Sequence, residues 1–180
     1  PQRMSVAVVN PLQLLRELFT IKGAGTLIRK GSRIERHEDL SRVNKIRLRA
    51  MMESAFGRPM INLAGLEQGI VRAYVEESYL GAVLISDSPV GPYLSKIVVE
   101  RQAQGEGIGG DLWSALVRDY DTFFWRARPS NPIASWYAKQ CDGFVRSPQW
   151  HVYWRGLAPR AIEAAVAHAT SLPADFAPPA

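Results

Sequence analysis

Apolar residues recur along the chain with two different periods, and these predict helices and strands in an interleaved order. Spacing of three or four residues indicates a helix over residues 38–56, where Leu40, Val43 and Ile46 lie between arginines. Short apolar, β-branched runs bounded by Gly, Pro or Asp indicate strands. The predicted strands are residues 70–77, 79–86, 93–100, 122–128 and 150–155, and the predicted helices are residues 11–19, 38–56, 108–120, 132–140 and 158–170.

From residue 38 the predicted order is helix, three strands, helix, strand, helix and strand, which is typical of an α/β or α+β fold with strands in mixed directions. Before it, Lys22-Gly23-Ala24-Gly25-Thr26 ends the short first helix, because glycines break helices. We interpret residues 1–30 as a linker or the end of a preceding domain. Residues 31–172 are expected to form one domain, and residues 173–180, with three prolines, a loose tail.

The composition is that of a globular protein. The chain has 180 residues, 47% hydrophobic and 22% charged, so one main domain is expected. No apolar run approaches the ~20 residues that a membrane helix needs, and we expect no membrane partner. Because the first residue is Pro1, we interpret the chain as a fragment or a processed product. The one cysteine, Cys141, excludes an internal disulfide and fits a reducing compartment.

The net charge of +5 is concentrated early in the chain. Residues 1–60 hold 12 Lys/Arg and 5 Asp/Glu, a balance of +7, whereas residues 61–180 hold 10 and 12, a balance of −2. A nucleic-acid-binding surface usually combines a basic patch with stacking aromatics, but most aromatic residues here lie late. We therefore expect no nucleic-acid partner and attribute the basic excess to anionic small ligands or to a neighbouring domain.

Histidine and cysteine spacing does not indicate a metal site. His37, His151 and His168 lack the spacing of metal ligands. Cys141 has no histidine close to it in sequence, so a structural thiol is the better interpretation than a nucleophile. We expect no metal in the chemistry of this protein.

A glycine-rich segment between a predicted strand and a predicted helix is the first candidate for ligand chemistry. Amides at a helix start attract anions, and glycines let the backbone approach closely. A Walker P-loop would end in Gly-Lys-Ser/Thr, and a Rossmann fingerprint would stand early in a βαβ unit. Here Asp111 follows the last glycine, and three predicted strands precede the segment. It reads Val98-Val99-Glu100-Arg101-Gln102-Ala103-Gln104-Gly105-Glu106-Gly107-Ile108-Gly109-Gly110.

The pattern Gln102-x-x-Gly105-x-Gly107 after a β-branched strand resembles the acetyl-CoA signature of the GNAT superfamily. The resemblance implies a GNAT fold, with a central mixed, mostly antiparallel sheet flanked by helices. It also implies acetyl-CoA as co-substrate, with the coenzyme A pyrophosphate on the loop amides. A glycine-rich turn that binds no ligand is the alternative. By resemblance, the cofactor contacts are Ile97, Val98, Val99, Gln104, Gly105, Glu106, Gly107, Ile108 and Gly109.

Further stretches resemble, more narrowly, the acetyltransferase domain of the N-acetylglutamate synthases of vertebrates, fungi and some bacterial bifunctional synthase/kinases. The tryptophan and arginine spacing makes this resemblance more specific than the glycine loop, and it covers residues 31–158. Residues 22–27 resemble the junction that follows an amino-acid kinase domain in such proteins. The stretches are Phe56-Gly57-Arg58, Tyr93-Leu94-Ser95-Lys96, residues 124–133 (FWRARPSNPI), Trp136-Tyr137, Gln149-Trp150 and Trp154-Arg155-Gly156-Leu157.

The charges of these stretches suit an acidic acceptor, because the two carboxylates of glutamate require cations. Arg126 and Arg128 are two apart on a predicted strand and therefore share a face, and Arg can bind a carboxylate with two parallel bonds. The alternative for any one of these arginines is a solvated surface residue that binds no ligand. The resemblance implies that glutamate is bound by Arg58, Lys96, Arg126, Arg128 and Asn131, with Tyr93 lining the pocket. Arg58 stands where family members often carry Lys, which keeps the charge but changes the shape.

Tyr137 is the candidate catalytic residue. In the superfamily a tyrosine at this place faces the thioester sulfur and donates a proton or hydrogen bond to the leaving thiolate. The amine then attacks the acetyl carbon directly, while backbone amides near Val98 steady the oxyanion. The alternative for Tyr137 is a buried aromatic of the core.

The function that the resemblance implies is N-acetylglutamate synthesis from acetyl-CoA and L-glutamate, in arginine biosynthesis. The parent protein would also carry an amino-acid kinase domain, form a homo-oligomer, and lie in the bacterial cytoplasm in preference to the mitochondrial matrix. Two alternatives remain: a regulatory or interaction module that keeps the fold, and an acetyltransferase for another amine acceptor.

Overall fold

The computed structural model describes residues 5–8, 26–29 and 31–178, and divides the chain into two units, Pro1–Ser32 and Arg33–Ala180. In the first unit, β1 (Ser5–Val8) pairs antiparallel with β2 (Thr26–Arg29). Strand β2 thus begins at Thr26, the last residue of the predicted break. The helix predicted at residues 11–19 lies outside the described residues.

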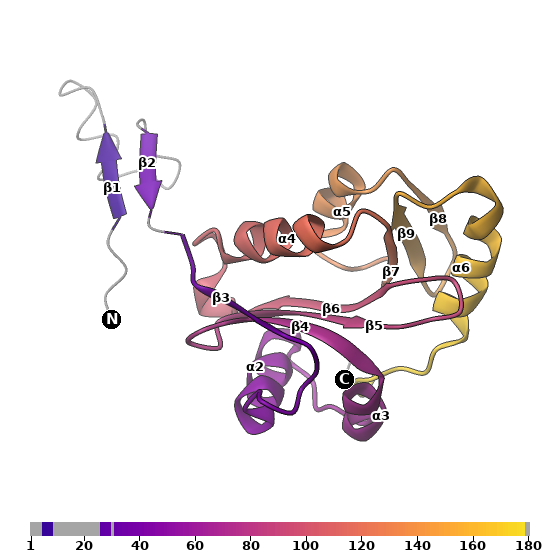
Figure 1. Ribbon diagram of the computed structural model, residues 1–180, viewed down its shortest axis with the longest axis horizontal. Helices are drawn as coiled ribbons and strands as arrows, with labels where there is room; N and C mark the ends of the chain where they lie inside the picture. Colours follow the sequence, from indigo (N-terminus) through magenta and orange to yellow (C-terminus); the bar gives the residue numbers. More distant parts are fainter. Residues whose placement is uncertain (1–4, 9–25, 30, 179–180) are drawn as a thin grey trace. The chain divides into compact units, whose positions relative to one another are not determined.

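The second unit contains a seven-stranded sheet. Its strands are β3 (Ile34–His37), β4 (Ile70–Glu76), β5 (Gly81–Ser86), β6 (Tyr93–Val99), β7 (Phe123–Ala127), β8 (Gly143–Arg146) and β9 (His151–Arg155). Their order across the sheet is β3-β4-β5-β6-β7-β9-β8 (Figure 1). All neighbours are antiparallel except β6 and β7, which are parallel. The predicted mixed, mostly antiparallel sheet is therefore confirmed.

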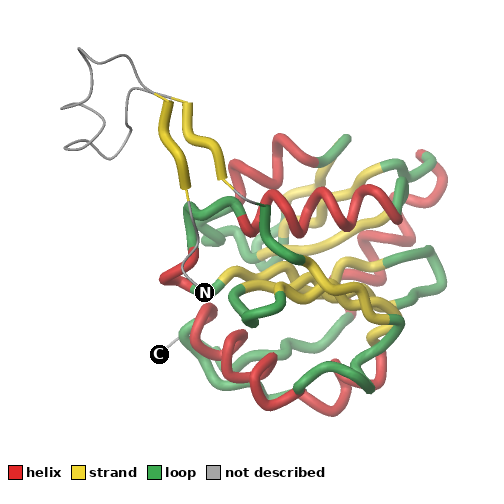
Figure 2. Tube along the Cα trace, turned by 60° about the vertical axis from the view of Figure 1, so that its left-hand side comes forward, coloured by secondary structure: helices red, strands yellow, loops and turns green. Residues whose placement is uncertain are grey.

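Helices cover both faces of this sheet (Figures 1 and 2). They are α2 (Lys45–Phe56), α3 (Leu63–Gly69), α4 (Ile108–Asp119), α5 (Ala134–Gln140) and α6 (Pro159–Ser171), with a 3₁₀ turn η2 (Arg101–Ala103). Alternation along β4 builds two cores, because successive strand residues point to opposite faces. Tyr74 packs in the cluster that contains Leu112 and Leu116 of α4, while Ala73 and Val75 pack with α2 and α3.

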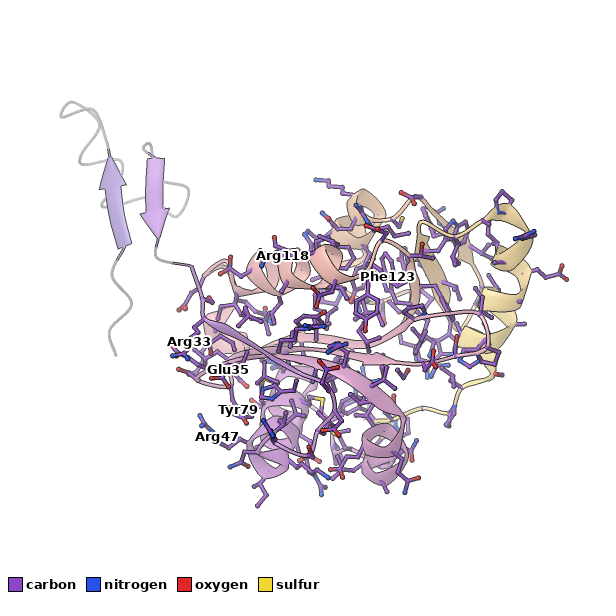
Figure 3. The ribbon with its side chains drawn as sticks, in the orientation of Figure 1. Arg33, Glu35, Arg47, Tyr79, Arg118 and Phe123 are labelled. Atoms are coloured by element: carbon purple, nitrogen blue, oxygen red, sulfur yellow. The ribbon has the colours of Figure 1, made fainter. Side chains whose placement is uncertain are left out.

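The start of α2 differs from the prediction. The helix begins at Lys45 and not near residue 38, because the Asn44 side chain accepts a hydrogen bond from the Arg47 amide at 3.1 Å and caps the first turn. The Asn44 amide donates to the Tyr79 hydroxyl at 2.8 Å, and the Arg47 guanidinium lies 4.3 Å from the centre of the Tyr79 ring (Figure 3). The apolar residues that suggested the longer helix behave differently: Leu40 and Val43 are buried before it, whereas Ile46 is 83% exposed.

Within the second unit, the short helix α3 and the short strands β3 and β8 were not predicted. Strand β3 lies at one edge of the sheet and β8 at the other, and each has only four residues. Because an edge strand has a neighbour on one side only, its sequence needs little apolar alternation. In β3, the charged residues Glu35 and Arg36 interrupt the apolar alternation that would indicate a strand.

The described part of the C-terminal segment, residues 173–178, is packed and does not match the expected loose tail. The Ile61 amide donates to the Asp175 carbonyl at 2.9 Å, and the Ala177 amide donates to the Pro59 carbonyl at 3.1 Å. The Phe176 ring lies 4.5 Å from the Phe56 ring, in the cluster of α2 and α3. Burial of this aromatic holds the segment against the domain. We call residues 172–177 the C-terminal strap.

None of the helices in the described ranges is long and apolar enough to cross a membrane.

Candidate active site

Strands β6 and β7 separate just after they meet, which opens the centre of the sheet. Their register holds a single pair, Tyr93 with Phe124, and the Phe124 amide donates to the Pro92 carbonyl at 3.2 Å. Beyond this point β6 stays paired with β5 as far as Val99, while β7 pairs with β9. Within the described sheet, the rest of β6 therefore has no register partner on its β7 side. Unpaired backbone groups of this kind can bind an extended ligand, which suits the predicted contacts at Ile97, Val98 and Val99.

The glycine loop follows β6 directly and leads into α4. Gly105 and Gly107 adopt left-handed φ values of 88° and 86°, a conformation that glycine allows without strain. The Asp111 amide donates to the Gly107 carbonyl at 3.1 Å. The amides of Ile108 and Gly109 precede this first helical bond, and helix-start amides have no partner within the helix. These amides are placed to hold an anion.

Not every amide of the loop is available for the predicted pyrophosphate. The Gln104 amide donates to the Arg101 carbonyl and the Glu106 amide to the Ala103 carbonyl, both at 3.3 Å. The Gln104 side chain donates to the Val99 carbonyl at 3.3 Å and ties the loop back to β6. Gln104 and Glu106 therefore shape the loop, and the cofactor prediction rests mainly on the start of α4.

Replacing Gly105 or Gly107 by valine should weaken acetyl-CoA binding by roughly tenfold or more, about 1.4 kcal/mol. A β-branched residue is strained at left-handed φ, and its side chain would block the close approach of phosphate. Acetyl-CoA affinity is measured by titration calorimetry. Gly91→Val is the control, because Gly91 also has a positive φ, 124°, but lies in the β5–β6 turn. Wild-type affinity in both loop variants would contradict the assignment.

Tyr137 lies on α5 in an aromatic cluster and is only 5% exposed. Its ring centre is 5.6 Å from that of Trp125 and 5.4 Å from that of Tyr153. Burial raises the pKa of the Tyr137 hydroxyl well above its usual value of about 10. The phenol therefore stays protonated at neutral pH and is able to donate, as the leaving-group role requires.

Arg126 on β7 and Arg128 directly after β7 point to the same side, as predicted. Their guanidinium carbons lie 3.9 and 3.8 Å from the centre of the Trp150 ring. Their other partners differ. Arg128 is exposed and donates to the Gln149 carbonyl at 3.3 Å. Arg126 is half-buried and donates to a different set of carbonyls.

Arg126 holds the end of α6 and the beginning of the strap. It donates to the carbonyls of Ala169 at 2.6 Å, Leu172 at 2.8 Å and Pro173 at 2.6 Å. Cations stabilise the C-terminal end of a helix, where the last carbonyls have no helical donor. Much of the donor capacity of Arg126 is therefore used within the chain, and its predicted contact with glutamate would have to share or replace these bonds.

Lys96 lies on β6 beside the strap and forms an ion pair with Asp175. Burial lowers the pKa of Lys96, and the Asp175 charge opposes that shift. Burial also raises the pKa of the neighbouring Tyr93 to about 12, while Arg126 opposes the rise. Sequence reasoning missed Asp175, because it lies in the segment interpreted as a loose tail.

The other two predicted acceptor contacts flank this cluster. Arg58 is half-buried and directly precedes Pro59, which pairs with the strap. The Asn131 amide donates to the Arg128 carbonyl at 3.0 Å, and the Asn131 side-chain oxygen accepts from the Ile133 amide at 3.0 Å. Asn131 therefore lies next to Arg128 in the loop before α5. Its side-chain nitrogen is the group that could donate to a ligand.

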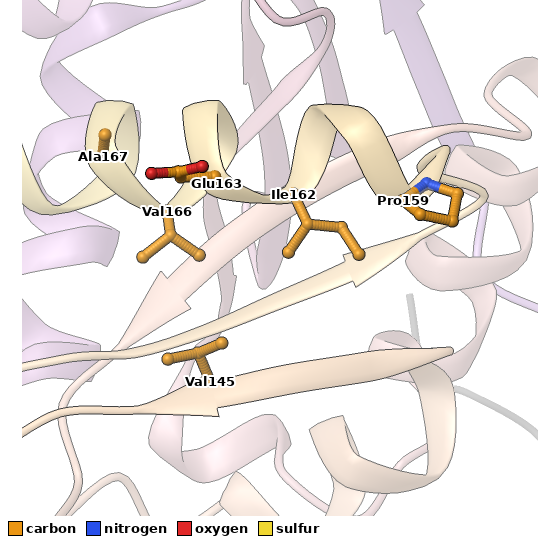
Figure 4. A pocket seen from close by; sticks show the side chains of 6 residues that line it. All are labelled: Val145, Pro159, Ile162, Glu163, Val166 and Ala167. Carbon is orange, nitrogen blue, oxygen red and sulfur yellow. The ribbon is translucent and has the colours of Figure 1, made fainter.

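The apolar pocket between α6 and β8 is separate from these residues (Figure 4). Its lining is Val145, Pro159, Ile162, Glu163, Val166 and Ala167, and none of the predicted site residues is among them. Over the described ranges there is no group of three His, Cys, Asp or Glu residues able to hold a metal ion.

A sheet opened between two parallel strands, a glycine loop at a helix start and a buried tyrosine define an acyltransferase domain of the GNAT class. The family model described as "NAT, N-acetyltransferase, of N-acetylglutamate synthase" matches residues 35–171, and the chain belongs to this family.

Named relatives agree with this membership. The chain is 39% identical to human mitochondrial N-acetylglutamate synthase, over 100% of this chain and 35% of that protein. It is 37% identical to an acetylglutamate kinase of Xylella fastidiosa, over 96% of this chain and 41% of that protein. The chain thus spans well under half the length of these relatives. N-acetylglutamate synthase from Neisseria gonorrhoeae, complexed with coenzyme A and N-acetyl-glutamate, matches the fold with a TM-score of 0.51 at 16% identity, over 79% of this chain and 39% of that one.

Proposed function

We propose that this domain transfers the acetyl group of acetyl-CoA to the α-amine of L-glutamate. The observation that carries the proposal is the placement of Lys96 on β6, Arg126 on β7 and Arg128 directly after β7, where the two strands separate at the centre of the sheet. Fixed cations on these strands suit an acceptor with two carboxylates. Family membership supports the same acceptor, because the family is that of N-acetylglutamate synthase.

The reaction takes place between acetyl-CoA at the glycine loop and the acceptor at the cations. The neutral amine nitrogen attacks the thioester carbonyl carbon, and the electron pair of the carbonyl moves to its oxygen, which backbone amides of β6 stabilise. When the intermediate collapses, the carbon–sulfur bond breaks and Tyr137 donates a proton to the departing thiolate. The amine loses its proton to water and Tyr137 regains one from water, so the products are N-acetylglutamate and free coenzyme A.

A panel of amino acids tests the acceptor. We expect thiol release from acetyl-CoA with L-glutamate to exceed that with glutamine, aspartate and lysine. Glutamine lacks the second charge, aspartate shortens the spacing between carboxylates, and lysine replaces a carboxylate with a cation. Faster release with another amino acid would favour a different amine acceptor. No release with any member, although acetyl-CoA binds, would favour a regulatory or interaction module.

The wider context is also a proposal. N-acetylglutamate production would serve arginine biosynthesis, and the name of the Xylella fastidiosa relative supports a parent protein with an acetylglutamate kinase domain. We further propose a homo-oligomer, located in the bacterial cytoplasm in preference to the mitochondrial matrix. Light scattering of the purified full-length protein and fractionation of its host cells test these two points.

A further inference from the structure

The C-terminal strap crosses the chain segments that carry three of the four predicted acceptor cations. Beside the Arg58 segment it pairs with Pro59 and Ile61. On β6 it reaches Lys96 through the side chain of Asp175. At β7 it begins with the Leu172 and Pro173 carbonyls that Arg126 holds. The strap therefore brings a carboxylate into the cluster where the substrate's own carboxylates are expected.

The Lys96 ammonium group has no donor left for a second carboxylate. An ammonium has three N–H donors, and the Lys96 nitrogen faces three acceptors: the Ser95 carbonyl at 3.0 Å, the Ser95 hydroxyl at 3.4 Å, and a carboxylate oxygen of Asp175. The Lys96 and Asp175 side chains are only 12% and 16% exposed. Water therefore screens the pair weakly, and a carboxylate arriving at Lys96 must take the place of one of these acceptors.

Asp175 is the acceptor that can leave. Ser95 is adjacent in the chain, so its carbonyl stays close to Lys96. Besides Lys96, the Asp175 carboxylate accepts a long bond of 3.5 Å from the Asn62 side chain. The strap itself remains anchored on both sides of Asp175, by Phe176 packed against the core and by Arg126 at Pro173. Rotation of one side chain can thus free Lys96 without unfolding the strap.

We infer that Asp175 is an internal competitor of the acceptor: its carboxylate occupies Lys96 in the free protein, and the acceptor binds by displacing it. This inference rests on the proposed function, since it requires that Lys96 binds an acceptor carboxylate. Its consequence is a higher acceptor concentration for half-saturation. The ion pair with Asp175 also keeps the buried Lys96 charge paired while no acceptor is bound, since an unpaired buried charge is costly.

Asp175→Asn tests the competition in the intact chain. Asparagine can still accept a hydrogen bond from Lys96 but carries no charge. We expect the L-glutamate KM to fall about fivefold or more, the low end of ordinary coupling between ligands, with little change in acetyl-CoA KM. N-acetyl-L-glutamate should likewise bind more tightly in calorimetry. Glu163→Gln is the matched control, because it removes one carboxylate from the exposed surface of α6 and should leave both constants unchanged.

The opposite outcomes overturn the inference. An unchanged or higher glutamate KM in Asp175→Asn would show that Asp175 does not compete, or that it supports Lys96. Should that variant not fold, Asp175→Ser, which also keeps a hydrogen-bond acceptor without charge, is measured in the same way. Failure of the proposed function is distinguishable, since wild-type protein would then release no thiol with glutamate.

Discussion

Replacing Arg128 by alanine should raise the L-glutamate KM roughly 30-fold, because bound glutamate would cover this side chain and loss of one partner of a charge pair desolvated in the complex costs about 2 kcal/mol or more. Arg128 is the exposed member of the arginine pair; its side chain donates to the Gln149 carbonyl at 3.3 Å and lies over the Trp150 ring. Because the side chain is exposed, its remaining N–H groups can donate to a carboxylate. Acetyl-CoA KM and the melting temperature should remain close to wild type.

The comparison with Arg126 makes this prediction sharper. Arg126→Ala should also raise the glutamate KM, but it should lower the melting temperature as well, because the Ala169, Leu172 and Pro173 carbonyls lose their donor. Arg160→Ala controls for the loss of one positive charge at an exposed position. A wild-type glutamate response in both Arg126→Ala and Arg128→Ala would refute the assignment of this face to the acceptor.

Tyr137→Phe should lower kcat about 100-fold with little change in either KM. General-acid assistance contributes ~10²–10⁴-fold. The low end is expected, because a thiol pKa of about 8.5 makes the thiolate a fair leaving group without help. A loss confined to the transition state appears in kcat and not in binding. Phenylalanine keeps the ring, so the contacts with Trp125 and Tyr153 should survive.

The pH dependence gives a second measurement of the same role. Burial raises the Tyr137 pKa, so the donor is present below that raised value and is lost only above it. Wild-type kcat should therefore not fall near pH 10, where an ordinary tyrosine ionises. Tyr153→Phe is the control, since it removes a hydroxyl from the adjacent ring in the same cluster. Normal kcat with weakened substrate binding in Tyr137→Phe would show a packing role. Unchanged kinetic constants would show that water or a backbone group donates to the leaving thiolate.

Patterns local in sequence were sufficient to predict many elements of this domain and the placement of several site residues. The glycine loop needs left-handed backbone at Gly105 and Gly107, and glycine itself marks that need. Two-residue spacing placed Arg126 and Arg128 on one face, which the shared contact with Trp150 confirms. Helical and strand periods likewise predicted α4 and β4 to β7, because each of these elements buries one or both faces in a repeating pattern.

Contacts between distant segments were decided by the tertiary structure alone. Asp175 meets Lys96 across a separation of 79 residues, and Arg126 reaches Pro173 across 47. No local pattern records such pairs, because periodicity reports which face of an element is buried and not what covers it. The edge strands β3 and β8 were missed for a related reason, since their pairing comes from one neighbour. The sequence by itself thus determined the fold class, the loop and the family resemblance, while long-range packing decided which cations of the site are already paired.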